Sequence, residues 1–167
     1  IYEGELIEIT GSLIPDLNYV ARSSGHVAIY IANGHGVWEA ALSNIVSIGD
    51  HILVLATGRF AHGWAEMARK MGVEVDILDF GKDKALDIHI LNEKLKSESK
   101  TKYKAILMTH VDTSTSVKND IASVRKKLDE IGCPALLAVD CIASLACDRF
   151  EICLLYTSDA ADDRNCG

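Results

Sequence analysis

The sequence lacks the features that mark several large classes of protein. Its 167 residues contain only two prolines, Pro15 and Pro134, which we expect at the edges of elements, and no repeats or low-complexity linkers. Acidic residues outnumber basic residues by 24 to 17, and the net charge of -7 argues against a nucleic-acid-binding surface. No apolar run approaches the roughly 18 residues that a membrane-spanning helix needs. We therefore expect one soluble domain with neither nucleic-acid nor membrane partners.

Cysteine patterns and N-terminal signals are also missing. The five cysteines show neither a CxxC pair nor a zinc-ligand spacing, so we expect free thiols, no metal site and a soluble intracellular protein, cytoplasmic by preference. The chain begins IYEGELIEIT, without an initiator methionine or the basic segment of a signal peptide. We interpret it as the interior of a longer protein.

What the sequence does contain is a regular alternation of two patterns. Near-continuous apolar runs, typical of strands buried on both faces, cover residues 27–32, 51–57, 73–78, 104–110 and 134–140. Segments with helical spacing cover residues 36–46, 60–72, 86–98 and 118–132. This βαβ alternation predicts an α/β fold of three layers, in which helices cover both faces of a mainly parallel sheet.

The last helical segment shows the pattern most clearly. Ile121, Val124, Leu128 and Ile131 fall on one helical face, and Gly132 stands where a C-terminal cap belongs. After residue 152 the alternation is lost. The stretch CLLYTSDAAD (153–162) matches the translation of a transposon end used in sequencing libraries. We therefore predict a partial large domain over residues 1–152 and a non-native tail over residues 153–167.

Ligands of parallel sheets bind beyond the carboxyl ends of the strands, and four polar clusters fall there. The first is Asn33-Gly34-His35-Gly36, between the run 27–32 and a helix. Glycines let the backbone approach an anion, and the amides of a helix N-terminus suit a phosphate. The same residues also suit a plain strand-to-helix turn, and the third glycine of a dinucleotide fingerprint is missing.

Two further clusters follow the second and fourth apolar runs. Thr57-Gly58-Arg59-Phe60 offers Phe60 as a flat apolar face for a ring, although an aromatic residue at a helix start belongs more often to the core. THVDTSTSV (109–117) offers hydroxyl groups to a polar ligand, or else caps the helix that begins near Asn119.

The fourth cluster is Asp140, at the end of the run 134–140. Burying a carboxylate there is costly unless it is paired, so we expect a cation, a metal or a protonated ring nitrogen beside it. Capping of the following helix is the alternative. We favour a binding role because the preceding run is so apolar.

Together these clusters resemble the class V aminotransferases of pyridoxal-phosphate fold type I, and most of all the alanine–glyoxylate and serine–glyoxylate aminotransferases. ANGHGVWEAAL is similar to the phosphate-loop motif S/N-G-H-x-x-x-E-A-A-L of the family, and LATGRFAHGWAEMARKMGVEVDIL to its second strand and helix. HVDTSTSVKNDI is similar to its hydroxyl loop, and LLAVDCIASLA to the strand that carries the cofactor aspartate. The resemblance covers roughly residues 15 to 152, and the motifs are specific collectively.

The resemblance implies pyridoxal 5'-phosphate as the cofactor and assigns roles by position. The amides of Gly34 and His35 would hold the phosphate, and Phe60 would stack on the pyridine ring. Thr113 would hydrogen-bond the ring oxygen, and Asp140 would pair with the protonated ring nitrogen. That pairing keeps the nitrogen positive, so the ring can accept electrons when the substrate loses its α-proton.

The sequence departs from the family at two places. Ser116 stands where glycine is usual, which leaves the backbone angles of the loop open at this position. The Schiff-base lysine of the family follows the aspartate by about two dozen residues in a G-S-Q-K-like stretch, whereas no lysine follows Asp140 here. The arginine that binds the substrate carboxylate is absent too. The parent protein would therefore be a transaminase, while we expect this chain to be inactive, with no catalytic residue of its own.

Fold type I also implies a sheet order of 1-7-6-5-4-2-3 by strand appearance. Strands 6 and 7 would follow residue 152, so we expect the run 27–32 either to border a gap or to pair in a non-native way. In both cases the phosphate loop and Asp140 would lose their shared frame, that is, the sheet would no longer hold them in fixed relative positions. Exposed strand edges would also favour aggregation.

Several functions stay open at this point. The first is transfer of an amino group from alanine or serine to glyoxylate or another small 2-oxo acid, in a parent protein that the resemblance implies is a homodimer. A cysteine desulfurase-like lyase is the nearest rival within the family. A Rossmann-like nucleotide-binding module is a rival outside it, disfavoured by the missing third glycine. We rank the transaminase first for the parent protein, but for this chain alone we rank first an incomplete product that does not fold stably.

Overall fold

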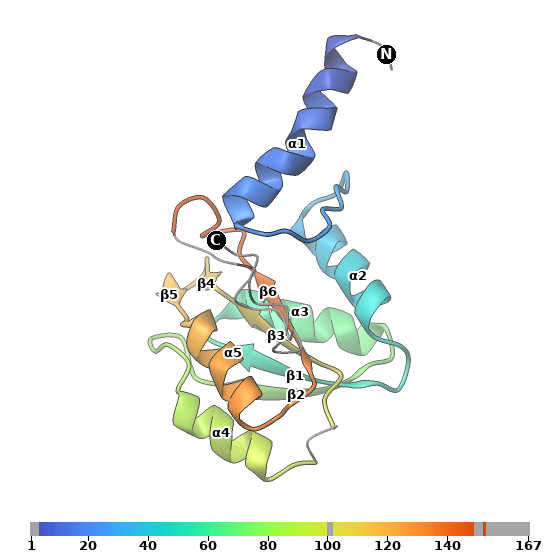
Figure 1. The fold of residues 1–167 in the computed structure, drawn as a ribbon. Coiled ribbons are helices and arrows are strands. Elements are labelled where there is room, and N and C mark those ends of the chain that lie inside the picture. The colour runs from blue at the N-terminus through green and yellow to red at the C-terminus, as the bar shows by residue number, and fades with distance from the viewer. Residues whose placement is uncertain (1–3, 100–101, 149–151, 153–167) are drawn as a thin grey trace.

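The computed structural model describes residues 4–99, 102–148 and 152 (Figure 1). Its helices are α1 (Glu5–Ala21), α2 (Gly34–Ile45), α3 (Arg59–Lys70), α4 (Ile88–Lys96) and α5 (Ile121–Glu130). Its strands are β1 (His51–Ala56), β2 (Glu74–Asp79), β3 (Ala105–Thr109), β4 (Val111–Asp112), β5 (Val117–Lys118) and β6 (Leu136–Asp140). The predicted tail, residues 153–167, lies outside the described residues.

The main sheet consists of four parallel strands in the order β2-β1-β3-β6. β1 lies between β2 and β3, and the register places Thr109 of β3 opposite Asp140 of β6. This is the order predicted for the last four apolar runs, and it is confirmed. The short strands β4 and β5 form a separate antiparallel hairpin after β3. Because all four main strands run the same way, their carboxyl ends meet at one edge of the sheet.

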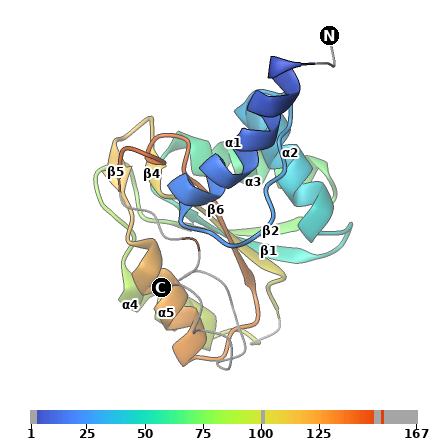
Figure 2. The same cartoon turned by 45° about the horizontal axis from the view of Figure 1, so that its top comes forward.

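Helices cover both faces of this sheet, as predicted (Figures 1 and 2). Successive side chains of a strand point to opposite faces, so β1 contributes to two cores. Leu53 and Leu55 pack with side chains of α4 and α5, whereas Ile52 and Val54 pack with side chains of α2 and α3. All four are fully buried, and each stabilises the fold by roughly 1.5–3 kcal/mol relative to an exposed position.

Helix α5 forms where its sequence predicts. The side chain of Asp120 accepts the amide of Ser123 at 3.0 Å, which satisfies one of the free amides of the first turn. Val124 and Leu128 on the predicted apolar face are fully buried. The chain leaves the helix through Gly132, whose φ of 63° is the left-handed conformation of a C-terminal cap. The predicted face and the predicted cap are both confirmed.

The prediction of a strand over residues 27–32 is wrong. This segment is irregular, with Ile29 and Tyr30 about half exposed and Ile31 fully exposed. A strand needs a neighbour for its amides and carbonyls, and none of the described strands pairs with this segment. The apolar composition that suggested a buried strand therefore marks a segment without a partner rather than a sheet member.

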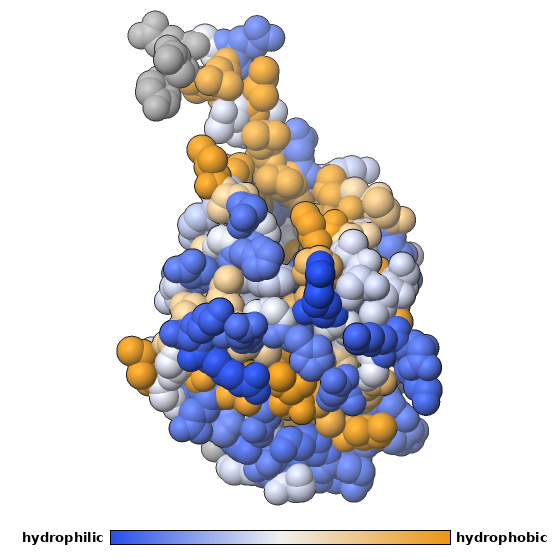
Figure 3. Space-filling model, turned by 180° about the vertical axis from the view of Figure 1, so that it is seen from behind, coloured by the Kyte–Doolittle hydropathy of each residue, from blue (hydrophilic) through white to orange (hydrophobic). Residues whose placement is uncertain are grey.

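Helix α1 extends away from the body of the molecule (Figure 1). Pro15 lies within it and not at an edge, contrary to the prediction; the hydrogen bond it removes is to the carbonyl of Gly11, an exposed position where water can donate instead. Within this fully described helix no residue is buried, and apolar side chains such as Leu6 and Ile14 are about half exposed (Figure 3). None of the described helices combines the length and apolarity that a bilayer crossing requires.

Candidate functional site

The carboxyl ends of β3 and β6 place Asp140 at the edge of the sheet where the polar clusters were expected. Its side chain is half-buried and both oxygens accept hydrogen bonds. Oδ1 accepts the amide of Ile142 at 3.0 Å, and Oδ2 accepts the indole Nε1 of Trp38 at 2.9 Å. A carboxylate oxygen can accept two hydrogen bonds, so each oxygen retains capacity for a further donor.

The turn Asn33-Gly34-His35-Gly36 forms the first turn of α2. Asn33 is the N-cap, and its side chain accepts the amide of Gly36 at 3.0 Å, while its carbonyl accepts the amide of Val37 at 3.2 Å. A helix leaves its first amides without intrahelical acceptors, and here these are the amides of Gly34 and His35. Both residues are exposed, and the space beside Gly34 is open. The break after residue 32 is therefore a helix start with two amides available to an anion.

Trp38 connects these two parts of the site. Besides its hydrogen bond to Asp140, its ring lies 4.8 Å from the His35 ring and 6.3 Å from the Phe60 ring, both edge-on, and stacks on Trp64 at 5.8 Å. The structure thus brings His35, Phe60 and Asp140 around one buried side chain. The expectation that the phosphate loop and Asp140 lose their shared frame is wrong, because this indole joins them directly.

Phe60 lies in the first turn of α3, where Asp112 binds its amide. Asp112 is not among the site residues predicted from the sequence. The buried carboxylate of Asp112 accepts the amide of Phe60 at 3.0 Å and that of Ala61 at 3.4 Å. Its other oxygen accepts the amide and the hydroxyl of Ser114. Asp112 therefore caps α3 from another segment, since Gly58, the N-cap residue, has no side chain to do so.

The hydroxyl loop lies against the start of α3 through the neighbours of Thr113. Ser114 Oγ accepts the amide of Arg59 at 3.0 Å, and Thr115 Oγ1 donates to the carbonyl of Thr57 at 3.1 Å. Thr113 itself is exposed. Ser116, which stands where the family usually has glycine, adopts a φ of 60°, the left-handed conformation that glycine takes most easily.

Beneath the site, Asn119 joins the ends of β1 and β3. Its amide group donates to Thr57 Oγ1 and to the carbonyl of Thr109, both at 2.9 Å, and its carbonyl oxygen accepts the amide of Leu86 at 3.0 Å. Asn119 is almost fully buried, so these bonds satisfy a polar group that would otherwise destabilise the core. The alternative prediction is that hydroxyl groups of residues 109–117 cap the helix that begins near Asn119. The side chain of Asp120 caps this helix, α5, instead.

Three residues of this site, Trp38, Asp112 and Asn119, were missed as site residues. Trp38 has the spacing of a core residue, and only the fold reveals its polar contact. Asp112 lies within the hydroxyl-rich stretch 109–117, and the signal in the sequence for its role is Gly58, a glycine at a helix start where a capping side chain is usual. Across residues 4–99, 102–148 and 152 no group of three or more metal-ligating side chains is clustered.

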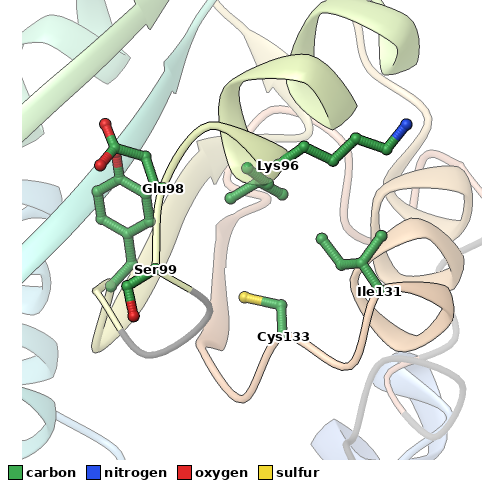
Figure 4. Close-up of a pocket in the computed structure, with 7 residues that line it drawn as sticks. Lys96, Glu98, Ser99, Ile131 and Cys133 are labelled. Atoms are coloured by element: carbon green, nitrogen blue, oxygen red, sulfur yellow. The ribbon is translucent and has the colours of Figure 1, made fainter.

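A pocket lies elsewhere, at the amino end of the strands (Figure 4). Its lining includes Leu95, Tyr103, Ile131 and Cys133. Tyr103 lies shortly before β3 in the sequence, and Cys133 lies shortly before β6. Glu98 at its rim is paired with Lys94 and Lys102. None of the residues predicted to hold a cofactor lines this pocket, so it does not belong to the candidate site.

Comparison with known proteins settles the family. Residues 23–152 match the family model described as aminotransferase class V. The chain belongs to the class V aminotransferase family. A serine–glyoxylate aminotransferase of Methylorubrum extorquens is 34% identical over 144 residues, covering 86% of this chain and 36% of the relative. The serine–glyoxylate aminotransferase of Arabidopsis thaliana is 32% identical over 145 residues, with the same coverage.

Solved structures agree on the fold of this class V aminotransferase chain. The alanine–glyoxylate aminotransferase from Nostoc sp. superposes with a TM-score of 0.77 at 23% identity, covering 86% of this chain and 37% of that one. An aspartate aminotransferase from Thermus thermophilus superposes with a TM-score of 0.80 at 22% identity, covering 92% and 43%. The predicted α/β large-domain fold is confirmed, and the chain spans little more than a third of the length of the curated relatives it matches.

Proposed function

We propose that the protein to which this class V aminotransferase chain belongs is a pyridoxal-phosphate-dependent transaminase. It moves an amino group from a small amino acid, alanine or serine, to glyoxylate or another small 2-oxo acid. One observation carries the proposal: the carboxylate of Asp140 and the free amides that begin α2 lie in a single frame, joined by the 2.9 Å hydrogen bond from Trp38. A cationic ring nitrogen and a phosphate are the partners that these two groups suit.

The residues present fit pyridoxal 5'-phosphate. The amides of Gly34 and His35, at the positive end of the α2 dipole, would hold its phosphate, and the open space beside Gly34 leaves room for it. Phe60 offers an apolar face for the ring, and the hydroxyl of Thr113, an exposed residue, would hydrogen-bond a polar ring substituent. Asp140 retains an acceptor position on each oxygen for the ring nitrogen.

The chemistry divides between the cofactor and the protein. When bound, pyridoxal 5'-phosphate supplies an electron sink for bond breaking at the α-carbon of the amino acid. Asp140 would hold a proton on the ring nitrogen through its negative charge, and Phe60 would exclude water from one face of the ring. Residues 141–167 contain no lysine, so the amine that the reaction requires is not in this chain. We therefore propose that the 167-residue chain binds the cofactor without completing the reaction.

The substrates are inferred from the relatives. Two that exceed 30% identity are named serine–glyoxylate aminotransferases, and a third, from Paracoccus denitrificans, is named L-aspartate–glyoxylate aminotransferase. All three names support glyoxylate as acceptor, and the two serine–glyoxylate names support a small amino acid as donor. They do not favour the lyase or the nucleotide-binding alternative. The homodimer stays a prediction for the parent protein.

The experiment that tests the proposal uses a chain extended past residue 152 from the parent locus. Incubated with pyridoxal 5'-phosphate, it is expected to develop the absorption band of an internal imine and to transfer amino groups from serine or alanine to glyoxylate. Asp140→Asn is expected to lower the rate at least 100-fold, because the ring nitrogen loses its counter-charge. Asp120→Asn, a carboxylate that caps α5, is the matched control and should change the rate little. An extended chain that binds no cofactor would overturn the proposal.

A further inference from the structure

The two ends of the candidate site lie on different elements. The free amides belong to the first turn of α2, whereas Asp140 ends β6 about a hundred residues later in the chain. A ligand held at both ends is bound well only if the span between them is fixed. The hydrogen bond from Trp38 Nε1 to Asp140 Oδ2 is a direct polar link between the two elements.

The geometry of Trp38 suits this linking role. Its side chain is 6% exposed, and it lies one turn into α2 from His35. Trp64 stacks on one side of the ring with an interplanar angle of 14°, which fixes the plane of the indole. Because the plane is fixed, the direction of the Nε1–H bond is fixed too, and it sets the orientation of the carboxylate that it meets.

Trp64 provides an internal contrast. Its indole is buried to a similar degree, at 3% exposed, and belongs to the same stacked pair. Its Nε1, however, has no hydrogen-bond partner among the described residues. The two tryptophans therefore share packing and differ in one polar contact, so they can be compared directly.

We infer that Trp38 is a positioning residue of this site, which orients the Asp140 carboxylate toward a ring nitrogen and holds it at a set distance from the anion-binding amides of α2. Since it concerns the same site, this assignment rests on the proposed function. It predicts that loss of the indole N–H weakens a ligand that carries both ring and phosphate, and leaves phosphate alone unaffected.

The test uses the 167-residue chain and pyridoxamine 5'-phosphate, which needs no lysine to bind. Trp38→Phe keeps the stacked ring and removes the donor; Trp64→Phe is the matched control. Calorimetric titration is expected to show that Trp38→Phe weakens pyridoxamine 5'-phosphate about tenfold, in line with the loss of a hydrogen bond to a charged group, and that Trp64→Phe weakens it less than twofold. Inorganic phosphate should bind all three proteins equally.

A second measurement follows the protonation of the bound ring by its absorbance. A well-oriented carboxylate favours the protonated ring nitrogen, so the absorbance change of bound pyridoxamine 5'-phosphate on deprotonation should occur at lower pH in Trp38→Phe than in the wild type. Trp64→Phe should leave this midpoint in place. A general loosening of the fold would not separate the two variants in this way.

The contact can also be checked without any variant of Trp38. In ¹⁵N spectra of the indole groups, Asp140→Asn is expected to move the Trp38 Nε1–H resonance and to leave that of Trp64 unchanged. If the wild-type chain does not bind pyridoxamine 5'-phosphate, the proposed function fails for this chain and the inference falls with it. If the wild type binds but the two phenylalanine variants behave alike, or Asp140→Asn leaves the Trp38 resonance in place, the inference alone is overturned.

Discussion

The buried carboxylate of Asp112 holds two parts of the candidate site together. It accepts the first amides of α3 on one oxygen and the Ser114 amide and hydroxyl on the other, so it joins the helix start to the hydroxyl loop. This requires very close packing. A Cβ built on Gly58 would lie 2.3 Å from Asp112 Cγ, which no real side chain tolerates. Gly58 is in extended backbone that any residue can adopt, so the reason for glycine here is the carboxylate beside it.

The pair Gly58 and Asp112 yields a prediction for stability. Gly58→Ala should lower the free energy of unfolding by about 1–3 kcal/mol through overpacking, and Asp112→Ala by about 2–3 kcal/mol through amides left without an acceptor. In the double variant, the loss of unfolding free energy should be at least about 1 kcal/mol smaller than the sum of the two single losses, because removing the carboxylate makes room for the methyl group. Urea unfolding of the four proteins measures this.

Gly63→Ala in the same helix is the control for that cycle. Its Cβ would meet Trp38 at 3.5 Å, an ordinary contact, so alanine should be neutral or stabilise by up to about 1 kcal/mol through its helix propensity. Strictly additive effects of the Gly58 and Asp112 substitutions would show that the two residues do not compete for the same space.

At the scale of elements, the sequence predicts helices and strands that depend on local residue patterns. It fails where an element depends on a neighbour that is distant in the sequence. The runs that form β1 and β3 are recognisable because strands buried on both faces are uniformly apolar, whereas β2 and β6, the outer strands of the described sheet, are only partly buried. The run 27–32 has the same composition, and composition cannot reveal that no described strand lies beside it. Gly34, His35, Phe60, Thr113 and Asp140 are predicted as site residues from motifs. Trp38 is not, because its hydrogen bond joins residues 102 positions apart, beyond the reach of spacing rules.

The amino end of β2 carries an ion network that should make stability depend on pH. Asp76 accepts the hydroxyl of Tyr103 at 2.6 Å and pairs with Lys102 at 2.9 Å. The Tyr103 hydrogen bond, followed by that of Lys102, holds the pKa of Asp76 well below its usual range. A carboxyl whose pKa is lower in the folded state stabilises the fold above its unfolded pKa, near 4, and this stabilisation is lost as the pH falls through the folded value.

The substitution Asp76→Asn tests this network. It should lower the free energy of unfolding at pH 7 by about 1–2 kcal/mol, an amount kept modest because the group is partly exposed to solvent. The difference from the wild type should shrink progressively as the pH is lowered from 5 to about 2, because part of the stabilisation by the ionised Asp76 is lost once the pH falls below the unfolded pKa. Asp16→Asn, on the exposed face of α1, is the control. A difference that stayed constant over this range would rule out the ionised Asp76 as its source.

At the scale of the whole molecule, most of the large apolar side chains that are exposed among the described residues belong to one region of the chain, residues 6–37. This region consists of α1, the irregular segment with Ile29 and Ile31, and the start of α2 with Val37, which follow one another in the sequence. In Figure 1, α1 extends from the body of the molecule, and Figure 3 shows apolar side chains gathered along this extension. Strand β6 adds an outer edge that pairs with no other described strand. Uncovered apolar patches and open strand edges are the features that drive association between chains.

The purified 167-residue chain should therefore associate with itself at micromolar concentrations, as sedimentation velocity would reveal by a weight-average mass that rises with concentration. Placing charges in this region, with Ile29→Lys and Ile14→Glu together, should shift the distribution toward monomer, because buried charge opposes both apolar contact and edge pairing. Ile90→Glu on α4 is the matched control: Ile90 is 49% exposed, against 54% for Ile29, and α4 packs on the sheet face opposite to α2. A chain that stays monomeric, or one that Ile90→Glu disperses equally well, would show that this region does not drive association.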